Sequence, residues 1–158
     1  MNSAAQELRI IRAQPYQAPL LTRIAVKAKR HWDYPEAWMK QWTDALTIPP
    51  SAVARDHVYC AELDGLAVGF YILREREARG ELEHLWVLPE FMGQGIGRAL
   101  FEHAVEQARM RRLSHFFIES DPNAAGFYVR MGARRIDTFV SDLGGVQREV
   151  PVFAYELR

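Results

Sequence analysis

The stretch LEHLWVLPEFMGQGIGRAL, residues 82–100, contains three local patterns in succession. Leu82 to Leu88 is an apolar run rich in β-formers and is closed by Pro89, which predicts a strand. Glycines then alternate with other residues at positions 93, 95 and 97, and from there apolar residues recur at helical spacing. The stretch therefore predicts a strand, a glycine turn and a helix in that order.

This order of elements is typical of an anion-binding site. Glycines allow backbone N–H groups to point inward without a Cβ clash, and the N-terminus of the helix adds partial positive charge. A dinucleotide fingerprint needs Gly-x-Gly-x-x-Gly, but Arg98 or Leu100 stands at the last position, and the Gly-Lys-Ser/Thr of a P-loop is absent. Taken alone, the pattern is also compatible with a turn that binds nothing.

A second motif lies about thirty residues further along the chain. It reads NAAGFY at residues 123–128 and is followed by MGA at residues 131–133. Asp121 and Pro122 predict the start of a helix, and Gly132 predicts its end. By themselves, Phe127 and Tyr128 are more typical of plain core.

Together the two motifs resemble those of GNAT-superfamily N-acetyltransferases, in which a strand ending in Val-x-Pro precedes a glycine loop that binds pyrophosphate. Val87, Leu88 and Pro89 precede the glycines here. The departure is Met92, where the family prefers Arg or Gln. The resemblance covers roughly residues 54–155 and implies a single domain over residues 1–158. Its expected fold is a mixed α+β (α/β) domain with a central twisted mixed sheet flanked by helices.

The resemblance also implies acetyl-CoA as co-substrate, and the spacing of the five histidines predicts no metal. In the family, the Asn of the second motif contacts the pantetheine arm and the Tyr hydroxyl stands near the sulfur. The residues then expected to bind acetyl-CoA are Leu85, Trp86, Val87, Met92, Gly93, Gln94, Gly95, Gly97, Arg98, Asn123, Phe127 and Tyr128.

The chemistry of aminolysis suggests roles for a few side chains. The departing thiolate needs a proton, and a tyrosine hydroxyl with a pKa of about 10 can supply one, so Tyr128 is the predicted acid. A backbone N–H of the central strand could stabilise the developing oxyanion. The predicted base is Glu83, ahead of Glu81, acting directly or through water. Both would share a strand face with Leu85 if pairing is regular, and His84 is the alternative on the opposite face.

The resulting hypothesis is an acetyl-CoA-dependent N-acetyltransferase that passes an acetyl group to a primary amine by direct attack on the thioester. The acceptor would be an amine-bearing small molecule, a peptide N-terminus or a lysine. The alternative is a non-catalytic acyl-CoA-binding or sensor module on the same fold. A nucleotide-binding domain is a third class, and it predicts binding of NAD or ATP in place of CoA.

Composition narrows the partners and the location. The chain of 158 residues has 20 basic and 20 acidic side chains, so no overall basic field is available for nucleic acid or an anionic membrane. The single cysteine, Cys60, excludes an internal disulfide and favours a reducing compartment. No signal sequence or long apolar run is visible, so the expected location is cytoplasmic, and a homodimer is left open. The five histidines lack the usual spacing of metal ligands.

The segment from His31 to Pro35 could shape an acceptor pocket, although its neighbouring tryptophan stripe is more typical of core.

The remaining elements follow from periodicity and turn residues. The expected elements are a strand at Leu8–Arg12, a helix at Pro19–Arg30, one helix from Pro35 to Pro49 carrying Tyr34, Trp38, Trp42 and Leu46, a hairpin of His57–Glu62 with Leu66–Arg74, a solvated loop at Glu75–Gly80, a strand at His115–Ser120, and final strands near Arg135–Ser141 and Val152–Leu157 joined by a loop.

Overall fold

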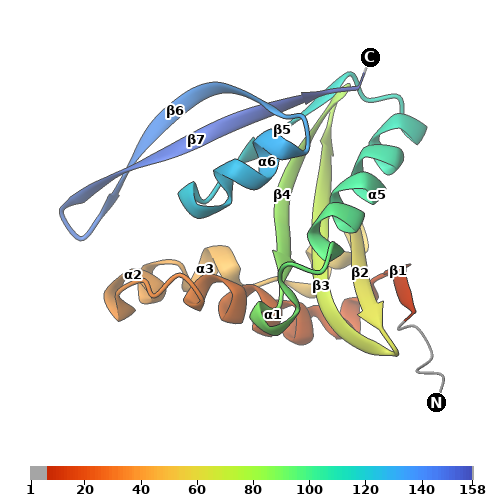
Figure 1. Ribbon diagram of the computed structural model, residues 1–158, viewed down its shortest axis with the longest axis horizontal. Helices are drawn as coiled ribbons and strands as arrows, with labels where there is room; N and C mark the ends of the chain where they lie inside the picture. The colour runs from red at the N-terminus through yellow and green to blue at the C-terminus, as the bar shows by residue number, and fades with distance from the viewer. Residues whose placement is uncertain (1–6, 158) are drawn as a thin grey trace.

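The computed structural model describes residues 7–157. It contains one seven-stranded sheet in the order β1-β2-β3-β4-β5-β7-β6 (Figure 1). The strands are β1 (Leu8–Arg12), β2 (His57–Leu63), β3 (Leu66–Arg76), β4 (Arg79–Val87), β5 (His115–Glu119), β6 (Arg134–Leu143) and β7 (Val146–Glu156). The α-helices are α1 (Ala18–Arg30), α2 (Glu36–Gln41), α3 (Thr43–Leu46), α4 (Pro50–Arg55), α5 (Ile96–Met110) and α6 (Ala125–Arg130), and short 3-10 turns η1 (Pro15–Gln17), η2 (Pro89–Phe91) and η3 (Pro122–Ala124) precede three of them.

Helices cover both faces of the sheet. The apolar side of α5, with Leu100 and Phe101, packs against one face, where it meets Tyr71, Leu73 and Phe116. The apolar side of α1 packs on the other face, against β2 and β3 side chains that include Val58, Phe70 and Ile72. Each fully buried side chain of this size stabilises the fold by about 1.5–3 kcal/mol. The expected mixed α+β architecture is confirmed.

The pairing of β4 with β5 is the feature that shapes the site. These two strands are parallel and share only two register pairs, Gly80 with Phe116 and Glu81 with Phe117. β4 then continues to Val87 along β3 alone, and the sheet opens between the two strands. Every other neighbouring pair in the sheet is antiparallel. The opening lies beside α5 on one face and α1 on the other (Figure 1).

The first hairpin confirms its turn signal and corrects the loop after it. Asp64 and Gly65 adopt φ values of 50° and 82° between β2 and β3, as a two-residue hairpin turn requires. The predicted solvated loop at Glu75–Gly80 is wrong, because β3 runs on to Arg76 and β4 begins at Arg79. The register pairs Arg74 with Glu81, Glu75 with Gly80 and Arg76 with Arg79 continue the ladder where composition alone suggested a loop.

One helix prediction is also wrong, and the two final strands are confirmed with greater lengths than expected. The single helix expected from Pro35 is divided into α2 and α3 at Trp42, and α4 follows Pro49, where the chain was expected only to end a helix. The final strands are longer than expected and meet in a tight turn at Gly144 and Gly145, with φ values of 58° and 84°. The β6–β7 hairpin therefore extends well beyond the other strands of the sheet and overhangs α2 and α3 (Figure 1).

Cys60 lies on β2, next to the edge strand β1, and is fully buried. Burial raises the pKa of its thiol to about 12, as expected for an inert thiol. No helix within residues 7–157 has both the length and the apolar character needed to cross a membrane.

Candidate active site

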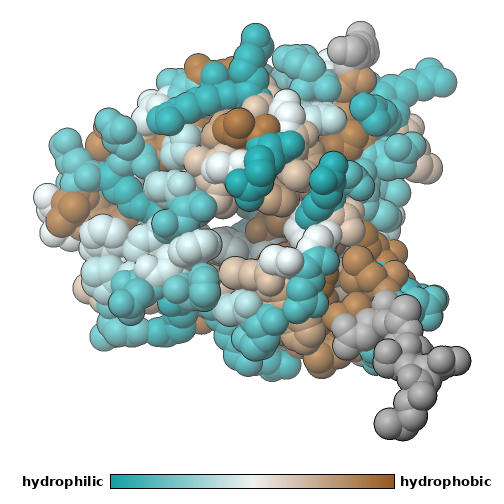
Figure 2. Space-filling view, in the orientation of Figure 1, coloured by the Kyte–Doolittle hydropathy of each residue, from teal (hydrophilic) through white to brown (hydrophobic). Residues whose placement is uncertain are grey.

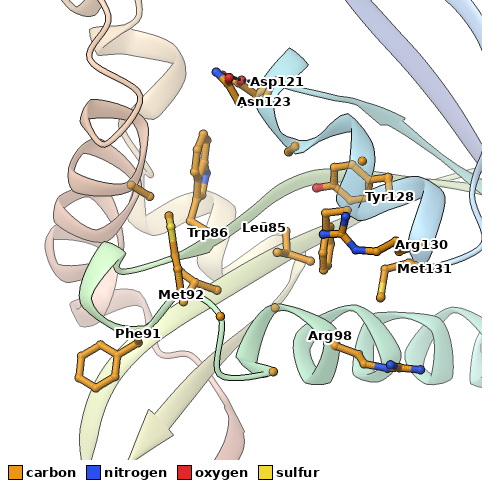
Figure 3. Close-up of a pocket in the computed structure, with 18 of the residues that line it drawn as sticks. Leu85, Trp86, Phe91, Met92, Arg98, Asp121, Asn123, Tyr128, Arg130 and Met131 are labelled. Carbon is orange, nitrogen blue, oxygen red and sulfur yellow. Dashed lines mark hydrogen bonds between the residues drawn. The ribbon is translucent and has the colours of Figure 1, made fainter.

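A cleft of about 500 Å³ passes through the opening between β4 and β5 (Figure 3). Its walls come from β4, from the turn that leads into α5, and from the η3–α6 segment, and α1 adds Ala28 beside Trp32 on the far side. The lining includes residues from both predicted motifs, although they are separated in the sequence. A volume of this size is typical of a site for a small molecule or cofactor.

One end of the cleft has the backbone features of an anion-binding site. Gly93 and Gly95 have φ values of 78° and 83°, and Gly95 caps α5 in the left-handed conformation. The first amides of α5, those of Ile96, Gly97 and Arg98, have no carbonyl one turn earlier to donate to. The first turn also carries no acidic residue. Backbone N–H groups and the helix dipole therefore favour a negative group here.

The glycine turn also has a packing role at its third glycine. A Cβ on Gly97 would lie 3.4 Å from the ring of Phe127 and 3.8 Å from Val87 Cγ2. Because Gly97 has no side chain, α5 can lie close to α6 beside the cleft. The two motifs thus meet through Gly97 and Phe127.

Tyr128 lies deeper in the same cleft. Its residue is only 6% exposed, and Figure 3 shows its hydroxyl pointing toward the side of the cleft where Trp86 lies. Burial, assisted by the negative charge of Asp121, raises the pKa of this phenol well above its ordinary value. Tyr128 is therefore protonated near neutral pH, which is the state that a proton donor needs.

The structure gathers the residues predicted for acetyl-CoA into one place. All of them line the cleft except Gln94, whose exposed side chain turns back to the carbonyl oxygen of Glu90. The lining further includes residues that the sequence did not suggest for this role, namely Ala28, Phe91, Ala124, Gly126, Arg130 and Met131.

The two predicted carboxylates lie outside this cleft. Glu81 and Glu83 line a neighbouring groove together with Glu119 and Arg74. The strand register shifts next to Glu83, between Ile72 and Leu73 of β3, so the regular pairing assumed for these residues does not occur. Their position relative to Leu85 therefore differs from the regular-strand expectation.

Glu83 is held by an ion pair. Its Oε2 lies 2.8 Å from Arg74 Nη2, and Arg74 also reaches the buried Asp56. Burial raises the pKa of the Glu83 carboxyl, and the charge of Arg74 opposes that change without cancelling it. A carboxylate with a raised pKa is a stronger base than an ordinary glutamate.

His84 has a defined tautomer. Its Nδ1 accepts a hydrogen bond of 2.9 Å from the indole Nε1 of Trp86, so the neutral ring carries its proton on Nε2. Burial lowers the pKa of His84 to about 4. At neutral pH the ring therefore offers an N–H donor and has no free lone pair for a substrate proton.

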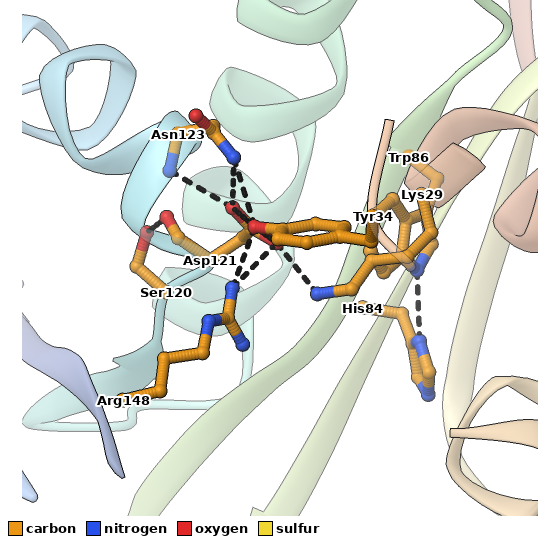
Figure 4. Close-up of polar contacts among 8 residues, drawn as sticks. All are labelled: Lys29, Tyr34, His84, Trp86, Ser120, Asp121, Asn123 and Arg148. Carbon is orange, nitrogen blue, oxygen red and sulfur yellow. Dashed lines mark hydrogen bonds and ion pairs between the residues drawn. The ribbon is translucent and has the colours of Figure 1, made fainter. Parts of the chain in front are cut away.

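A cluster of charged and aromatic side chains closes the other end of the cleft (Figure 4). We call it the Asp121 cluster, and it comprises Lys29, Tyr34, Asp121, Asn123 and Arg148. Asp121 Oδ2 lies 2.5 Å from Lys29 Nζ and 3.2 Å from Arg148 Nη2, and the Tyr34 hydroxyl donates to this carboxylate at 3.0 Å. The backbone N–H of Asn123 donates to Asp121 Oδ1 at 2.8 Å, which confirms the predicted cap.

Aromatic rings surround the two cations of this cluster. Lys29 Nζ lies 4.0 Å from the ring centre of Trp42, and the Arg148 guanidinium lies 5.0 Å from the ring centres of both Tyr34 and Trp42. Burial and the charge of Asp121 raise the pKa of Tyr34 to about 12, so this phenol stays neutral. Burial raises the pKa of Asp121, but Lys29 and the surrounding hydrogen bonds lower it by more, so the carboxylate is ionised at neutral pH.

Sequence reasoning did not assign Lys29, Asp121 or Arg148 to the site. Lys29 did carry a signal, because it continues the buried series of Leu21 and Ala25 at strides of four. A lysine on the apolar face of a helix needs a partner. Arg148 carried no comparable signal, since it falls in a segment expected to be loop. Within residues 7–157, no group of three or more His, Cys, Asp or Glu side chains could hold a metal ion.

Comparisons with known proteins agree with this geometry. An uncharacterized N-acetyltransferase of Archaeoglobus fulgidus is 40% identical over 91 residues, which are 51% of this chain and 62% of that protein. The 5-NmdU N-acetyltransferase of Pseudomonas phage PaMx11 is 33% identical over 84 residues, 52% of this chain and 60% of its own length. The matched segments thus span about three fifths of the length of these curated relatives.

Solved structures match over nearly the whole chain. The PaiA N-acetyltransferase of Thermoplasma acidophilum, crystallised in complex with coenzyme A, has a TM-score of 0.79 at 16% identity over 95% of this chain and 99% of its own. The ribosomal-protein-S18-alanine N-acetyltransferase of Escherichia coli has a TM-score of 0.72 at 19% identity over 96% and 94%. At these identities the likeness concerns the fold. Residues 21–133 also match the sequence profile of the acetyltransferase (GNAT) family, and this chain belongs to that family.

Proposed function

We propose that the protein is an acetyl-CoA-dependent N-acetyltransferase that transfers an acetyl group to a primary amine by direct attack on the thioester. The observation that carries this proposal is the cleft itself. It has a glycine turn and a helix N-terminus at one end and the buried Tyr128 hydroxyl further in, with the opening of the sheet between them.

The residues present fit a CoA thioester. The amides of Gly93 to Arg98 would receive the pyrophosphate, and this contact does not depend on the side chain of Met92. The apolar walls formed by Leu85, Val87 and Phe127 suit the pantetheine arm. Asn123 stands at the far end of the cleft, where its side chain can contact an amide of that arm. The thioester supplies the activated acetyl group.

Three groups of this chain would carry the proton transfers and the charge. Glu83, which lies outside the cleft, takes a proton from the attacking amine through water, and its raised pKa supports that role. A backbone N–H of β4 in the open part of the sheet donates to the developing oxyanion. Tyr128 gives its proton to the departing thiolate, and because burial raises its pKa the phenol still carries that proton at neutral pH. Glu81 is the second candidate for the base.

The acceptor is proposed only as a class, an amine-bearing small molecule or peptide amine. The relatives named above differ in what they act on, one a 5-NmdU and another an alanine of a ribosomal protein. A family that keeps the acyl donor while the acceptor varies is consistent with an acceptor side built from segments outside the two motifs.

The test is to mix the protein with acetyl-CoA and a panel of primary amines, and to follow release of free thiol together with formation of the acetylated amine. We expect thiol release that depends on the amine, and stabilisation of the fold by CoA but not by NAD or ATP. CoA binding without turnover on any amine would favour the acyl-CoA-binding or sensor module. Stabilisation by NAD or ATP in place of CoA would favour a nucleotide-binding domain.

A further inference from the structure

The Asp121 cluster holds two cationic side chains and one carboxylate. Lys29 and Arg148 come from α1 and β7, and Asp121 stands between them at the end of β5. All three are largely buried, with side chains 9%, 12% and 7% exposed. Taking charges out of water costs free energy unless partners compensate them. Within residues 7–157, Asp121 alone compensates both cations through ion pairs, so the cluster carries an excess of positive charge.

Arg148 uses only part of its hydrogen-bonding capacity. Its Nη2 donates to the Tyr34 hydroxyl at 2.6 Å and to Asp121 Oδ2 at 3.2 Å. Nε and Nη1 donate to no side chain or carbonyl within residues 7–157. Figure 4 shows these two nitrogens pointing away from Asp121, on the side of the cluster opposite Asn123. Asn123 lines the cleft, so these free donors of Arg148 point away from the side of the cluster that lines it.

The surroundings make that side accessible to a ligand. Arg148 lies on the β6–β7 hairpin, which overhangs α2 and α3, and Figure 2 shows the surface hollowed between these two parts of the molecule. The guanidinium is held in place by Tyr34, Trp42 and Asp121, so few rotamers would be lost when a ligand binds. An immobilised guanidinium with free N–H groups is suited to a carboxylate.

We propose that Arg148 binds a carboxylate carried by one of the two substrates, with Asp121 and Tyr34 as positioning residues that fix the guanidinium. The inference deepens the proposed function, because it names the chemistry recognised on the acceptor side of the same site. The carboxylate has two sources, an amino acid acceptor or an acyl group that ends in a carboxylate. Both place a negative charge a few bonds from the reacting carbonyl carbon.

A binding experiment separates these sources without requiring turnover. Quenching of tryptophan fluorescence would report binding, since Trp42 and Trp86 lie within 4.0 and 6.0 Å of the Lys29 ammonium. The first arm titrates the CoA-loaded protein with N-acetyl amino acids and with their matched carboxamides. The second arm titrates the free protein with succinyl-CoA and with acetyl-CoA. In one arm we expect the carboxylate ligand to bind at least about 10-fold more tightly than its neutral match.

Variants test whether Arg148 is responsible. Arg148→Gln should abolish the preference for the carboxylate and leave the affinity of the neutral ligand unchanged. Arg148→Lys keeps a cation and should keep part of the preference, which guards against a Gln variant that fails to fold. The matched control is Arg134→Gln on the neighbouring strand β6, where the arginine is exposed and faces Glu156, and it should keep the full preference.

Two results would overturn the inference. The first is the lack of a carboxylate preference in both arms, including the case in which no member of the first panel binds. The second is an equal loss of charged and neutral ligands in Arg148→Gln, which would mean that Arg148 only ties the hairpin to the helices. Failure of the proposed function would look different, because amine-dependent thiol release would then be absent while the carboxylate preference in binding remained.

Discussion

The two ends of the cleft are built in different ways. The end proposed to bind CoA, called the CoA end below, is made of backbone: left-handed glycines and the first amides of α5, all from one contiguous stretch. The end proposed for the acceptor is made of side chains that meet from α1, the segment before α2, the turn after β5, and β7. A local sequence can encode the first kind of site, whereas the second kind exists only once the whole chain has folded.

This difference bears on how each end can change. A backbone site tolerates most side-chain substitutions, including Met92 where the family prefers Arg or Gln, as long as the glycines keep their conformation. A side-chain cluster loses its arrangement when one partner changes, because its charges compensate one another. The predictions below test the shared chemistry first and then each end of the cleft.

The largest effect is expected where both ends converge, at Tyr128. Tyr128→Phe keeps the ring in its buried contacts and removes only the hydroxyl. Loss of a general acid typically costs about 10²- to 10⁴-fold in rate, so turnover should fall by that order while the affinity for acetyl-CoA stays level. Steady-state kinetics beside a CoA titration measure both. Tyr155→Phe, a ring in the same core, is the control, and equal turnover in the two variants would remove Tyr128 from the mechanism.

Gly95→Asp should weaken CoA binding at the glycine turn. It places a Cβ at a φ of 83° and a negative charge where pyrophosphate is expected, so CoA affinity should fall by at least about 100-fold. Thermal stabilisation by CoA measures this. Gly65→Asp is a matched control, because Gly65 has a φ of 82° and is also free of neighbours within 4 Å, but lies in the β2–β3 turn. Equal CoA stabilisation in both variants would place the pyrophosphate elsewhere.

A smaller, pH-dependent effect is expected at Glu83. Glu83→Gln cannot accept the amine proton, so the rate should fall by about 10²-fold near neutral pH. The loss should shrink toward the pKa of the amine, about 10, where free amine forms unaided. Rate profiles of Glu83→Gln, Glu81→Gln and His84→Gln against pH distinguish the candidates. A loss of the same fraction at every pH would indicate that Glu83 serves only to hold Arg74.

The smallest effect concerns His84 and stability. Burial lowers its folded pKa to about 4, whereas an unfolded histidine titrates near 6.5. Between these values the unfolded chain binds a proton that the folded protein does not, so the free energy of unfolding falls as the pH drops from about 6.5 to 4. The contribution is at most about 3 kcal/mol.

Denaturant titrations over this pH window would measure that contribution. His84→Gln should flatten the dependence of stability on pH, while His31→Gln, at an exposed position after α1, should preserve it. An unchanged slope in His84→Gln would show that another group is responsible for it.

Much of the fold and of the CoA end could be predicted from the sequence, because the signals are local. Strand, glycine turn and helix follow one another over residues 82–100, and the residues of this stretch that were predicted to bind acetyl-CoA line the cleft apart from Gln94. The relation of Glu83 to Leu85 could not be predicted, since the bulge depends on the partner strand β3. The position of Arg148 in the site could not be predicted either, because the length of the final hairpin depends on pairing between β6 and β7.

The short parallel ladder between β4 and β5 has a consequence for hydrogen exchange. With only two register pairs joining them, strands β1 to β4 and strands β5 to β7 form two half-sheets that share little backbone bonding. Among the residues that the structure describes, the amides of β4 that face the opening have no strand partner beyond Glu81. They should exchange with solvent much faster than the amides that face β3, and slow down when an extended ligand arm lies along the strand. Exchange along β4 would thus alternate residue by residue, a pattern that a fully paired central strand does not give.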